Sequence, residues 1–500
     1  MSRIDLLRVP LLGPFLGWRH TRTLLQALCL GLAVLIILDG LFGPQLAPRN
    51  LAGTLPWVHW RGFVVLALLI AGNLFCMACP FMLPRRLAKR FGPARWSWPA
   101  PLRSKWVAVA ALILFFWAYE AFALWSSPWL TAWVALSYFA LAFVIDGFFK
   151  GASFCRHLCP IGQFHFVNSM VSPTEVAVRD PDVCASCETL DCIRGRYDPE
   201  TAAAHRSKQL ARPPDAASGR ALGLEGLVQG GCELALFQPR KGGNADCTFC
   251  LECIHACPHD NVGIVLRSPV QELIADEKRS GTGRIPRRLD WAALILLLTF
   301  AAWVNALGMT EPVFRLQAWI ASWAGTGSRQ FVLALYFVFG LIGLPFLVTL
   351  LTASASRALS SLHEPLTRTI PAYAPALVPV GFAMWTAHYL FHFLVGGLTI
   401  VPVVQEYLRD LGIAATGPPR WGAGALVPES WLLPIEIVIL QGGLLLTLVA
   451  GHRIASRREP DRRSAGRAFL PWAVLATLLT GAGIWLLTQP MEMRGTFEAL

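Results

Sequence analysis

Long apolar runs with few charged residues constrain this chain more than any other feature of its sequence. Each run is close to the ~20 residues with which an α-helix crosses ~30 Å of hydrocarbon. The low charged fraction, 15%, is typical of a polytopic membrane protein. We predict a mainly α protein with nine membrane spans: Leu24–Phe42, Arg61–Met77, Trp106–Trp125, Leu130–Phe149, Trp291–Met309, Phe331–Leu351, Ala374–Val401, Leu432–Ala450 and Phe469–Leu487.

The distribution of Lys and Arg predicts the orientation of these spans. The loops after the second and eighth spans are strongly basic, "LPRRLAKRFGPARWSWPAPLRSK" and "HRIASRREPDRRSAGR", and Arg357 and Arg368 follow the sixth. The positive-inside rule then places the N-terminus in the cytoplasm and the C-terminus outside. No small-residue cleavage site follows the first apolar run. We therefore expect a retained first helix in a bacterial-type inner (cytoplasmic) membrane.

This topology divides the chain into three parts. We expect a four-span membrane domain at residues 1–150, a cytoplasmic domain at 151–289 and a five-span membrane domain at 290–500. The net charge of +12 could indicate a nucleic-acid ligand, but the basic residues cluster in loops between apolar runs, where they set orientation. The expected partner is the lipid bilayer, with no nucleic acid.

The polar segment contains the most specific motif of the chain, "CTFCLECIHACPHD". Cys247, Cys250, Cys253 and Cys257 have the Cys-x2-Cys-x2-Cys-x3-Cys-Pro spacing with which bacterial ferredoxins bind iron–sulfur clusters. A four-cysteine zinc site usually combines two separated Cys-x2-Cys pairs, and a reducing cytoplasm disfavours a disulfide-bonded loop. We therefore predict an inserted, bacterial-type two-cluster ferredoxin domain of the α+β class.

The other cysteines of this domain complete the ligands of two [4Fe–4S] clusters. In two-cluster ferredoxins the fourth cysteine of a motif binds the other cluster. No Cys-Pro follows Cys192 promptly, and a basic, Ala/Gly/Pro-rich insertion at residues 194–230 precedes Cys232, the natural remaining ligand. The predicted ligands are Cys184, Cys187, Cys192 and Cys257 (the first-cluster set) and Cys247, Cys250, Cys253 and Cys232 (the second-cluster set).

Two further cysteine pairs, the membrane-edge set, lie at the predicted cytoplasmic edge of the bilayer. Cys76 and Cys79 end the second span in "FCMACP", and Cys155 and Cys159 follow the fourth in "FCRHLCP". Four converging thiolates could hold a third cluster or another metal, or form redox-active dithiols. A purely structural role at helix ends is the other alternative. Cys29, alone in the first span, is expected to be a small buried hydrophobe.

These motifs resemble those of a known family. Four N-terminal spans, Cys-Pro motifs at the ends of the second and fourth, and a following two-cluster ferredoxin domain look like the NapH/NosR-type membrane polyferredoxins. The resemblance covers about Leu24–Leu266, with "CMACP" one residue shorter than the family's Cys-x3-Cys-Pro. It implies electron transfer between the quinone pool and redox partners, or support for metalloenzyme maturation. With the central domain, the five C-terminal spans look more like the FesM-type membrane ferredoxins.

The seventh span carries a histidine pair in "MWTAHYLFHFLVGG". His388 and His392 are four residues apart and share a helix face. At ~1.5 Å per residue from Ala374 they lie ~20–27 Å along the span, in the outer half of the bilayer. They could ligate haem b with His59 as second ligand, bind a quinol, or hydrogen-bond within helix packing.

Four other polar side chains within the predicted spans are candidates for a proton route, because ionisable groups are costly inside a membrane. They are Glu120, Asp146, Glu436 and Gln441.

The sequence therefore predicts a membrane-bound iron–sulfur electron carrier. We expect the quinone-interacting subunit of an oxidoreductase complex, which connects a soluble cytoplasmic partner of the flavin or molybdenum dehydrogenase type to a membrane acceptor, quinone. No G-x-G-x-x-G motif follows a strand, so nucleotide chemistry would lie on the partner. The alternative is a maturation or regulatory protein that uses its clusters to reduce a metal or sense redox state.

Overall fold

The computed structural model describes residues 4–91, 96–203, 226–413 and 417–491. Residues 204–225 of the predicted insertion and residues 92–95 of the basic loop lie outside the described residues. Helix makes up 70% of the structure and strand 5%, which confirms the prediction of a mainly α protein.

Eight helical segments in the described part of the chain are long and apolar enough to cross a membrane. They are Thr21–Phe42, Leu51–Ala71, Pro128–Phe148, Leu289–Leu307, Arg329–Leu359, Leu366–Asp410, Glu429–Arg458 and Arg462–Leu487. The third predicted span, Trp106–Trp125, corresponds to the shorter apolar helix α7 (Trp106–Ala121), whose 16 residues rise only ~24 Å. It is followed by a left-handed residue, Ala123 (φ 43°). The long helices support a multi-pass membrane protein.

The chain forms two compact units that do not follow chain order. Unit 1 comprises Met1–Leu30, Ala67–Arg103 and Phe139–Ile285, and unit 2 comprises Gly31–Leu66, Ser104–Tyr138 and Pro286–Leu500. Three helices contribute residues to both units: α2 (Thr21–Phe42), α4 (Arg61–Ala71) and α8 (Pro128–Phe148). All thirteen cysteines belong to unit 1.

These units differ from the predicted linear division at residues 150 and 289. The reason is that the cysteine-rich segment shares its apolar core with distant parts of the chain. Leu16 and Met77 pack in one buried cluster with Phe249 and Ile264. Unit 1 therefore cannot be cut out as a continuous piece of sequence.

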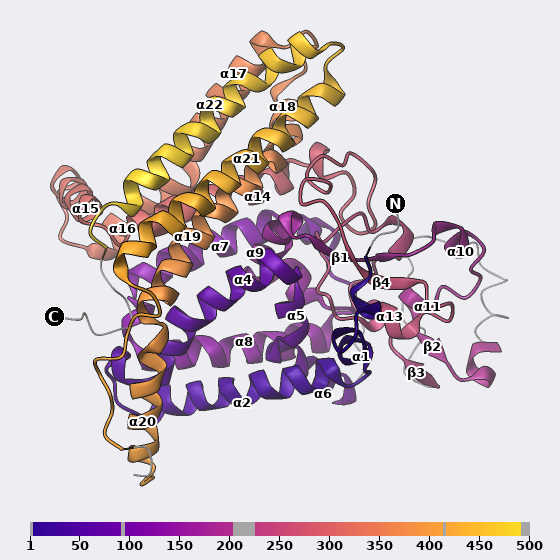
Figure 1. Ribbon diagram of the computed structural model, residues 1–500, viewed down its shortest axis with the longest axis horizontal. Helices are drawn as coiled ribbons and strands as arrows, with labels where there is room; N and C mark the ends of the chain where they lie inside the picture. The colour runs from indigo at the N-terminus through magenta and orange to yellow at the C-terminus, as the bar shows by residue number, and fades with distance from the viewer. Residues whose placement is uncertain (1–3, 92–95, 204–225, 414–416, 492–500) are drawn as a thin grey trace. The chain divides into compact units, whose positions relative to one another are not determined.

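Unit 1 consists of short helices and two small antiparallel sheets. In the larger sheet, β1 (Thr174–Val178) pairs with β4 (Val262–Leu266) along its whole length (Figure 1). The backbone of Asp5 bridges to Val265. The other elements are α1 (Leu12–Gly17), α5 (Leu74–Ala78), α6 (Leu83–Phe91), α9 (Pro160–Asn168), α10 (Pro181–Ala185), α11 (Asp191–Arg194), β2 (Arg196–Tyr197), β3 (Leu227–Gln229) and α13 (Glu252–Ala256).

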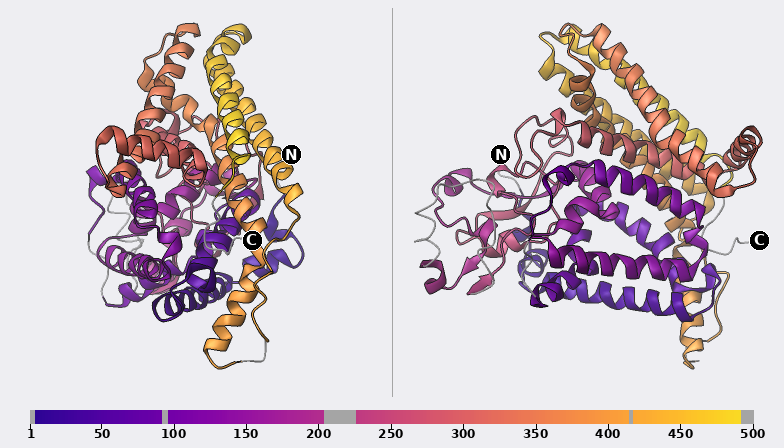
Figure 2. Two further views of the ribbon diagram at one scale, coloured as in Figure 1. Left: turned by 90° about the vertical axis from the view of Figure 1, so that its left-hand side faces the viewer. Right: turned by 180° about the vertical axis from the view of Figure 1, so that it is seen from behind.

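Unit 2 is an all-helical bundle. Two of its helices, α21 (Leu432–Arg458) and α22 (Arg462–Leu487), run side by side as an antiparallel pair (Figure 2). Its other helices include α3 (Leu51–Thr54), α14 (Leu289–Leu307), α15 (Glu311–Ala324), α16 (Arg329–Val338), α17 (Leu344–Leu359), α18 (Leu366–Tyr373), α19 (Val378–Gly396) and α20 (Ile400–Asp410).

Helix α14 lies at the centre of unit 2, because most of its residues are buried inside the bundle. Neighbouring helices hydrogen-bond to its backbone: Trp385 Nε1 donates to the Leu298 carbonyl at 2.8 Å, and the Tyr336 hydroxyl donates to the Val304 carbonyl at 2.9 Å. These polar side chains have their hydrogen bonds satisfied inside the bundle, as burial away from water requires.

Close packing of α21 on α19 leaves no room for a side chain at one of two adjacent glycines. A Cβ atom on Gly443 would lie 2.3 Å from the Cβ of Ala383 and 2.8 Å from the carbonyl oxygen of Pro379. A Cβ atom on the neighbouring Gly442 would meet nothing within 4 Å. Only Gly443 is therefore required by helix contact.

We predict that Gly443→Ala destabilises the protein by about 1–3 kcal/mol, because the added methyl group overpacks the α19–α21 contact. Gly442→Ala is the matched control and should be neutral or stabilising by up to about 1 kcal/mol, since alanine is the better helix former. Thermal unfolding in detergent would measure both. Equal midpoints for the two variants would contradict this packing.

Candidate functional site

The first-cluster set is brought together around Asn261. The Asn261 backbone N–H donates to Cys257 Sγ at 3.4 Å, and its side-chain Nδ2 donates to Cys184 Sγ at 3.3 Å. Burial, followed by thiolate charge on Cys257, Cys184 and Cys187, raises the pKa of Cys192 to about 12. The four predicted ligands therefore lie within electrostatic range of one another.

The second-cluster set is also brought together. Burial, followed by thiolate charge on Cys232, Cys250 and Cys247, raises the pKa of Cys253 well above its usual value. The Leu236 backbone N–H donates to Cys232 Sγ at 3.4 Å. Cys232, beyond the insertion, thus lies near the motif that begins at Cys247, and its role as a ligand stays a prediction.

The two sets are neighbours. The Cys232 backbone N–H donates to the Cys192 carbonyl at 2.8 Å, and Cys192 is also within electrostatic range of Cys232. This arrangement suits the pattern in which one motif contributes a ligand to the other cluster.

The loop between Cys247 and Leu251 has a backbone suited to an anion. Asp246, Phe249 and Leu251 adopt left-handed conformations (φ 59°, 51° and 59°), which are costly for residues other than glycine. Thr248, Phe249, Cys250 and Leu251 are buried, yet their backbone N–H groups donate no hydrogen bond within the described part of the chain. Alternating backbone conformations of this kind form N–H concavities that bind phosphates and iron–sulfur clusters.

Buried polar residues hold this loop in place. Glu272 is fully buried and accepts the backbone N–H groups of Asn244 at 2.7 Å and Ala245 at 3.0 Å. Arg267 and Arg279 pair with the same carboxylate at 2.7 and 2.6 Å. The charge of Glu272 is therefore compensated, and the chain entering the motif has a fixed position.

Asparagine side chains fix the loop from two other sides. Asn73 Nδ2, just before the membrane-edge cysteines, donates to the Cys247 carbonyl at 2.6 Å. Asn244 Nδ2 donates to the carbonyls of Ser169 at 3.0 Å and Thr174 at 2.8 Å. The strand β1 and the start of α5 are thereby tied to the motif.

The cysteines of the membrane-edge set lie near enough to one another for their charges to interact. Burial and then thiolate charge on Cys159 raise the pKa of Cys79 to about 12. Cys76 lies within electrostatic range of Cys79 and Cys159, and Cys155 within range of Cys159 and Cys79. Cys29 also lies within range of Cys79.

The Cys-Pro pairs have a local structural cause. Cys159 is the N-cap of α9, and its Sγ accepts the Gly162 backbone N–H at 3.2 Å. Pro160 occupies the first helical position, where its missing N–H costs nothing. Cys79 precedes Pro80 in the same way at the start of a 3-10 turn. The motif thus presents a sulfur atom at the start of a helix.

Sets of four cysteines can in general hold either a single ion or a cubane. Among the described residues, no three His, Cys, Asp or Glu side chains form a group that could hold one metal ion. A tetrahedral ion gathers its sulfur ligands around one centre, whereas a cubane distributes four thiolates over four irons. The thiol ligands, the N–H···S contacts and the free loop N–H groups all suit a cluster with negatively charged sulfur.

The sequence analysis did not predict a buried ionic network that lies next to the cysteines. Arg22 pairs with Glu233 at 2.9 Å and with Glu252 at 2.6 Å, and Arg85 also contacts Glu233. Although burial opposes it, these guanidinium groups lower the pKa of Glu233. Their positions in the sequence could have indicated these carboxylates, because Glu233 follows Cys232 and Glu252 lies between Cys250 and Cys253.

The histidine pair of the seventh predicted span lies in unit 2. His388 and His392 are buried on α19, with ring centroids 5.0 Å apart, which confirms their shared face. Both ring nitrogens of His59 face backbone carbonyls, of Gly397 at 2.9 Å and Thr54 at 3.4 Å. This arrangement does not favour His59 as a haem ligand.

The candidates for a proton route separate into different roles. Asp146 is buried and accepts the Phe154 backbone N–H at 2.9 Å, so it stabilises the turn before Cys155. Glu436 is buried on α21, and its Oε1 has no hydrogen-bond partner in the described structure. Glu120 is buried at the end of α7, and Gln441 is exposed.

No protein-family model, curated protein or solved structure was found to match this chain. The resemblance to the membrane polyferredoxins therefore rests on the cysteine motifs and their positions.

We predict that Cys79→Ser and Cys159→Ser each remove the same iron, about four atoms per chain, because both residues belong to one four-cysteine set. Cys29→Ser is the control and should leave the iron content unchanged. Iron and acid-labile sulfide assays on the full chain, purified without oxygen, would measure this. Unchanged iron in Cys79→Ser and Cys159→Ser would contradict a membrane-edge cluster and favour dithiols.

Proposed function

We propose that this protein is a membrane-bound iron–sulfur electron carrier that relays electrons between a soluble cytoplasmic partner and quinone in the membrane. The observation that carries the proposal is the buried loop Cys247–Leu251. It combines two predicted cluster ligands with buried backbone N–H groups that have no acceptor within the described residues. An anionic cluster would satisfy these groups.

The order of the three cysteine sets supports a relay. The first-cluster and second-cluster sets are joined by the Cys232–Cys192 backbone hydrogen bond. The second-cluster and membrane-edge sets also adjoin, since Cys76 lies within electrostatic range of Cys247. Bound [4Fe–4S] clusters, two in the ferredoxin-type sets and a third in the membrane-edge set, would supply one-electron transfer along this line.

The chain's own residues tune and shield this relay. Arg22 and Arg85 form a buried ion-pair network with Glu233 and Glu252 beside the cysteines, so fixed charges of both signs lie next to the site. Apolar side chains, including Met77, Phe249 and Ile254, pack around the cysteines and limit the access of water. Both effects set the redox potential through charge and burial.

The predicted orientation in the membrane indicates where a soluble partner would bind. The basic loops favour a cytoplasmic position for the cysteine-rich segment, where a flavin or molybdenum dehydrogenase could exchange electrons with the first-cluster set. The chain then acts as the quinone-interacting subunit of an oxidoreductase complex. Co-purification tests this: a stable complex with such a dehydrogenase supports the proposal. Isolation of the chain alone, with labile iron, would instead favour the maturation or redox-sensing function.

We predict that Cys250→Ser loses one EPR signal and part of the iron, because one ligand of the second-cluster set is removed. The signal of the first-cluster set should persist, since its ligands are unchanged. The measurement is EPR of the dithionite-reduced full chain, with Cys29→Ser as the matched control. If iron, sulfide and both signals survive in Cys250→Ser, the ligand assignment is wrong.

A further inference from the structure

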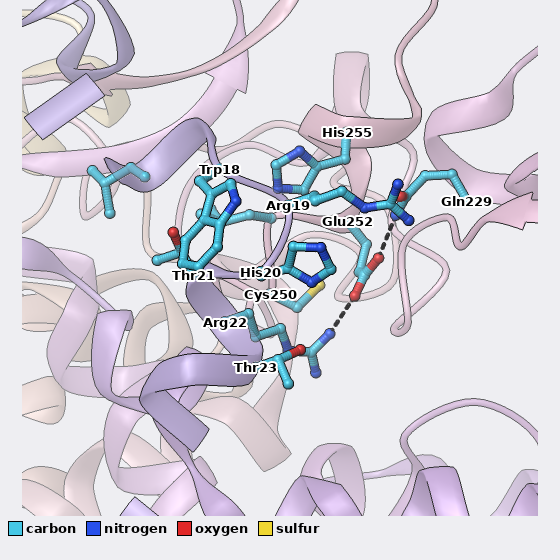
Figure 3. Close-up of a pocket in the computed structure, with 12 residues that line it drawn as sticks. Trp18, Arg19, His20, Thr21, Arg22, Thr23, Gln229, Cys250, Glu252 and His255 are labelled. Carbon is cyan, nitrogen blue, oxygen red and sulfur yellow. Dashed lines mark hydrogen bonds and ion pairs between the residues drawn. The ribbon is translucent and has the colours of Figure 1, made fainter. Parts of the chain in front are cut away.

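A cavity of about 180 Å³ in unit 1 reaches one of the predicted cluster ligands (Figure 3). Cys250 lines it from one side, and Trp18, Arg19 and His20 line it from the segment before α2. His255, from the Cys247 motif, completes this part of the wall. The cavity therefore connects the N-terminal segment directly to the second-cluster set.

The charged groups at the base of the cavity are paired with one another. The Glu252 carboxylate accepts hydrogen bonds from Arg22 Nη1 and Gln229 Nε2, both at 2.6 Å (Figure 3). The side chains of Arg19, His20 and His255 make no hydrogen bond within the described part of the chain. The cavity thus offers three side-chain donors to a ligand, while its carboxylate is already paired with Arg22.

The surroundings of the cavity point to the bilayer as the source of the ligand. Thr21 begins α2, a candidate membrane span, so the cavity lies where a span starts. The preceding segment exposes large apolar side chains: Leu11 is 89% exposed, Phe15 41% and Trp18 48%. Apolar and Trp side chains flanking a span are typical of the membrane–water interface.

We infer that this cavity binds the headgroup of a membrane quinone. The ring would pack against Trp18, and its carbonyl oxygens would accept hydrogen bonds from Arg19, His20 and His255. Conversion to the quinol takes two electrons, delivered one at a time from the Cys250 side, and two protons from water. The inference rests on the proposed function, because Cys250 must belong to a reducible site. It places the acceptor in unit 1, whereas the sequence had suggested His388 and His392 in unit 2.

The test is photolabelling of the full chain in nanodiscs with an arylazido short-chain benzoquinone, followed by mass-spectrometric peptide mapping. The expected labels lie within residues 16–23 and 250–255, and unlabelled quinone should compete for them. Labelling of the peptide that contains His388 and His392 would overturn the inference. Displacement of the label by anionic phospholipid, and not by quinone, would also overturn it.

Variants of the two histidines sharpen this test. His20→Leu and His255→Leu should each weaken quinone binding about five- to tenfold, the value of one lost hydrogen bond. His259→Leu is the matched control, since this exposed histidine of the same motif does not line the cavity. His20→Leu lies outside the cysteine motif, so unchanged binding in this variant with intact iron would refute the site. Absence of iron from the wild-type protein would refute the proposed function instead.

Discussion

The candidate site depends on one constraint, the need of buried backbone N–H groups for an acceptor. Thr248 to Leu251 bury four such groups in a loop without regular secondary structure, and two of these residues are left-handed. An apo protein would have to bear the full cost of their desolvation. A cluster with anionic sulfur would supply the acceptors, and the loop would then be a preformed receptor whose strain the bound group offsets.

Other residues of unit 1 hold this loop in its conformation. The fully buried Glu272 pairs with two arginines and accepts two backbone N–H groups before the motif. Asn73 fixes the Cys247 carbonyl. Because these contacts come from segments far apart in the chain, the site is a property of the assembled unit. The same interleaving brings α2, and with it Trp18 and Arg22, next to the cysteines.

The sequence predicted much of this arrangement, because membrane spans and cysteine spacing are local patterns. Apolar length revealed the helices, and motif spacing grouped cysteines that are electrostatic neighbours in the structure, including Cys232 across the insertion. Their role as ligands stays a prediction. The interleaved units could not be predicted, since they arise from packing of Leu16 and Met77 with Ile264. Nor could the roles of Asn261 and Arg22, whose partners are 77 and at least 211 residues away. No motif marks a residue whose function depends on a tertiary contact.

The central claim is that the three cysteine sets hold clusters, and its most direct test is the metal content of the wild-type full chain. The protein would be purified without oxygen, and iron, acid-labile sulfide and zinc would be measured, with Mössbauer spectra to identify cluster type. The account predicts about twelve iron and twelve sulfide per chain, four of each per set, in [4Fe–4S] form. Stoichiometric zinc, or iron without labile sulfide, would contradict it.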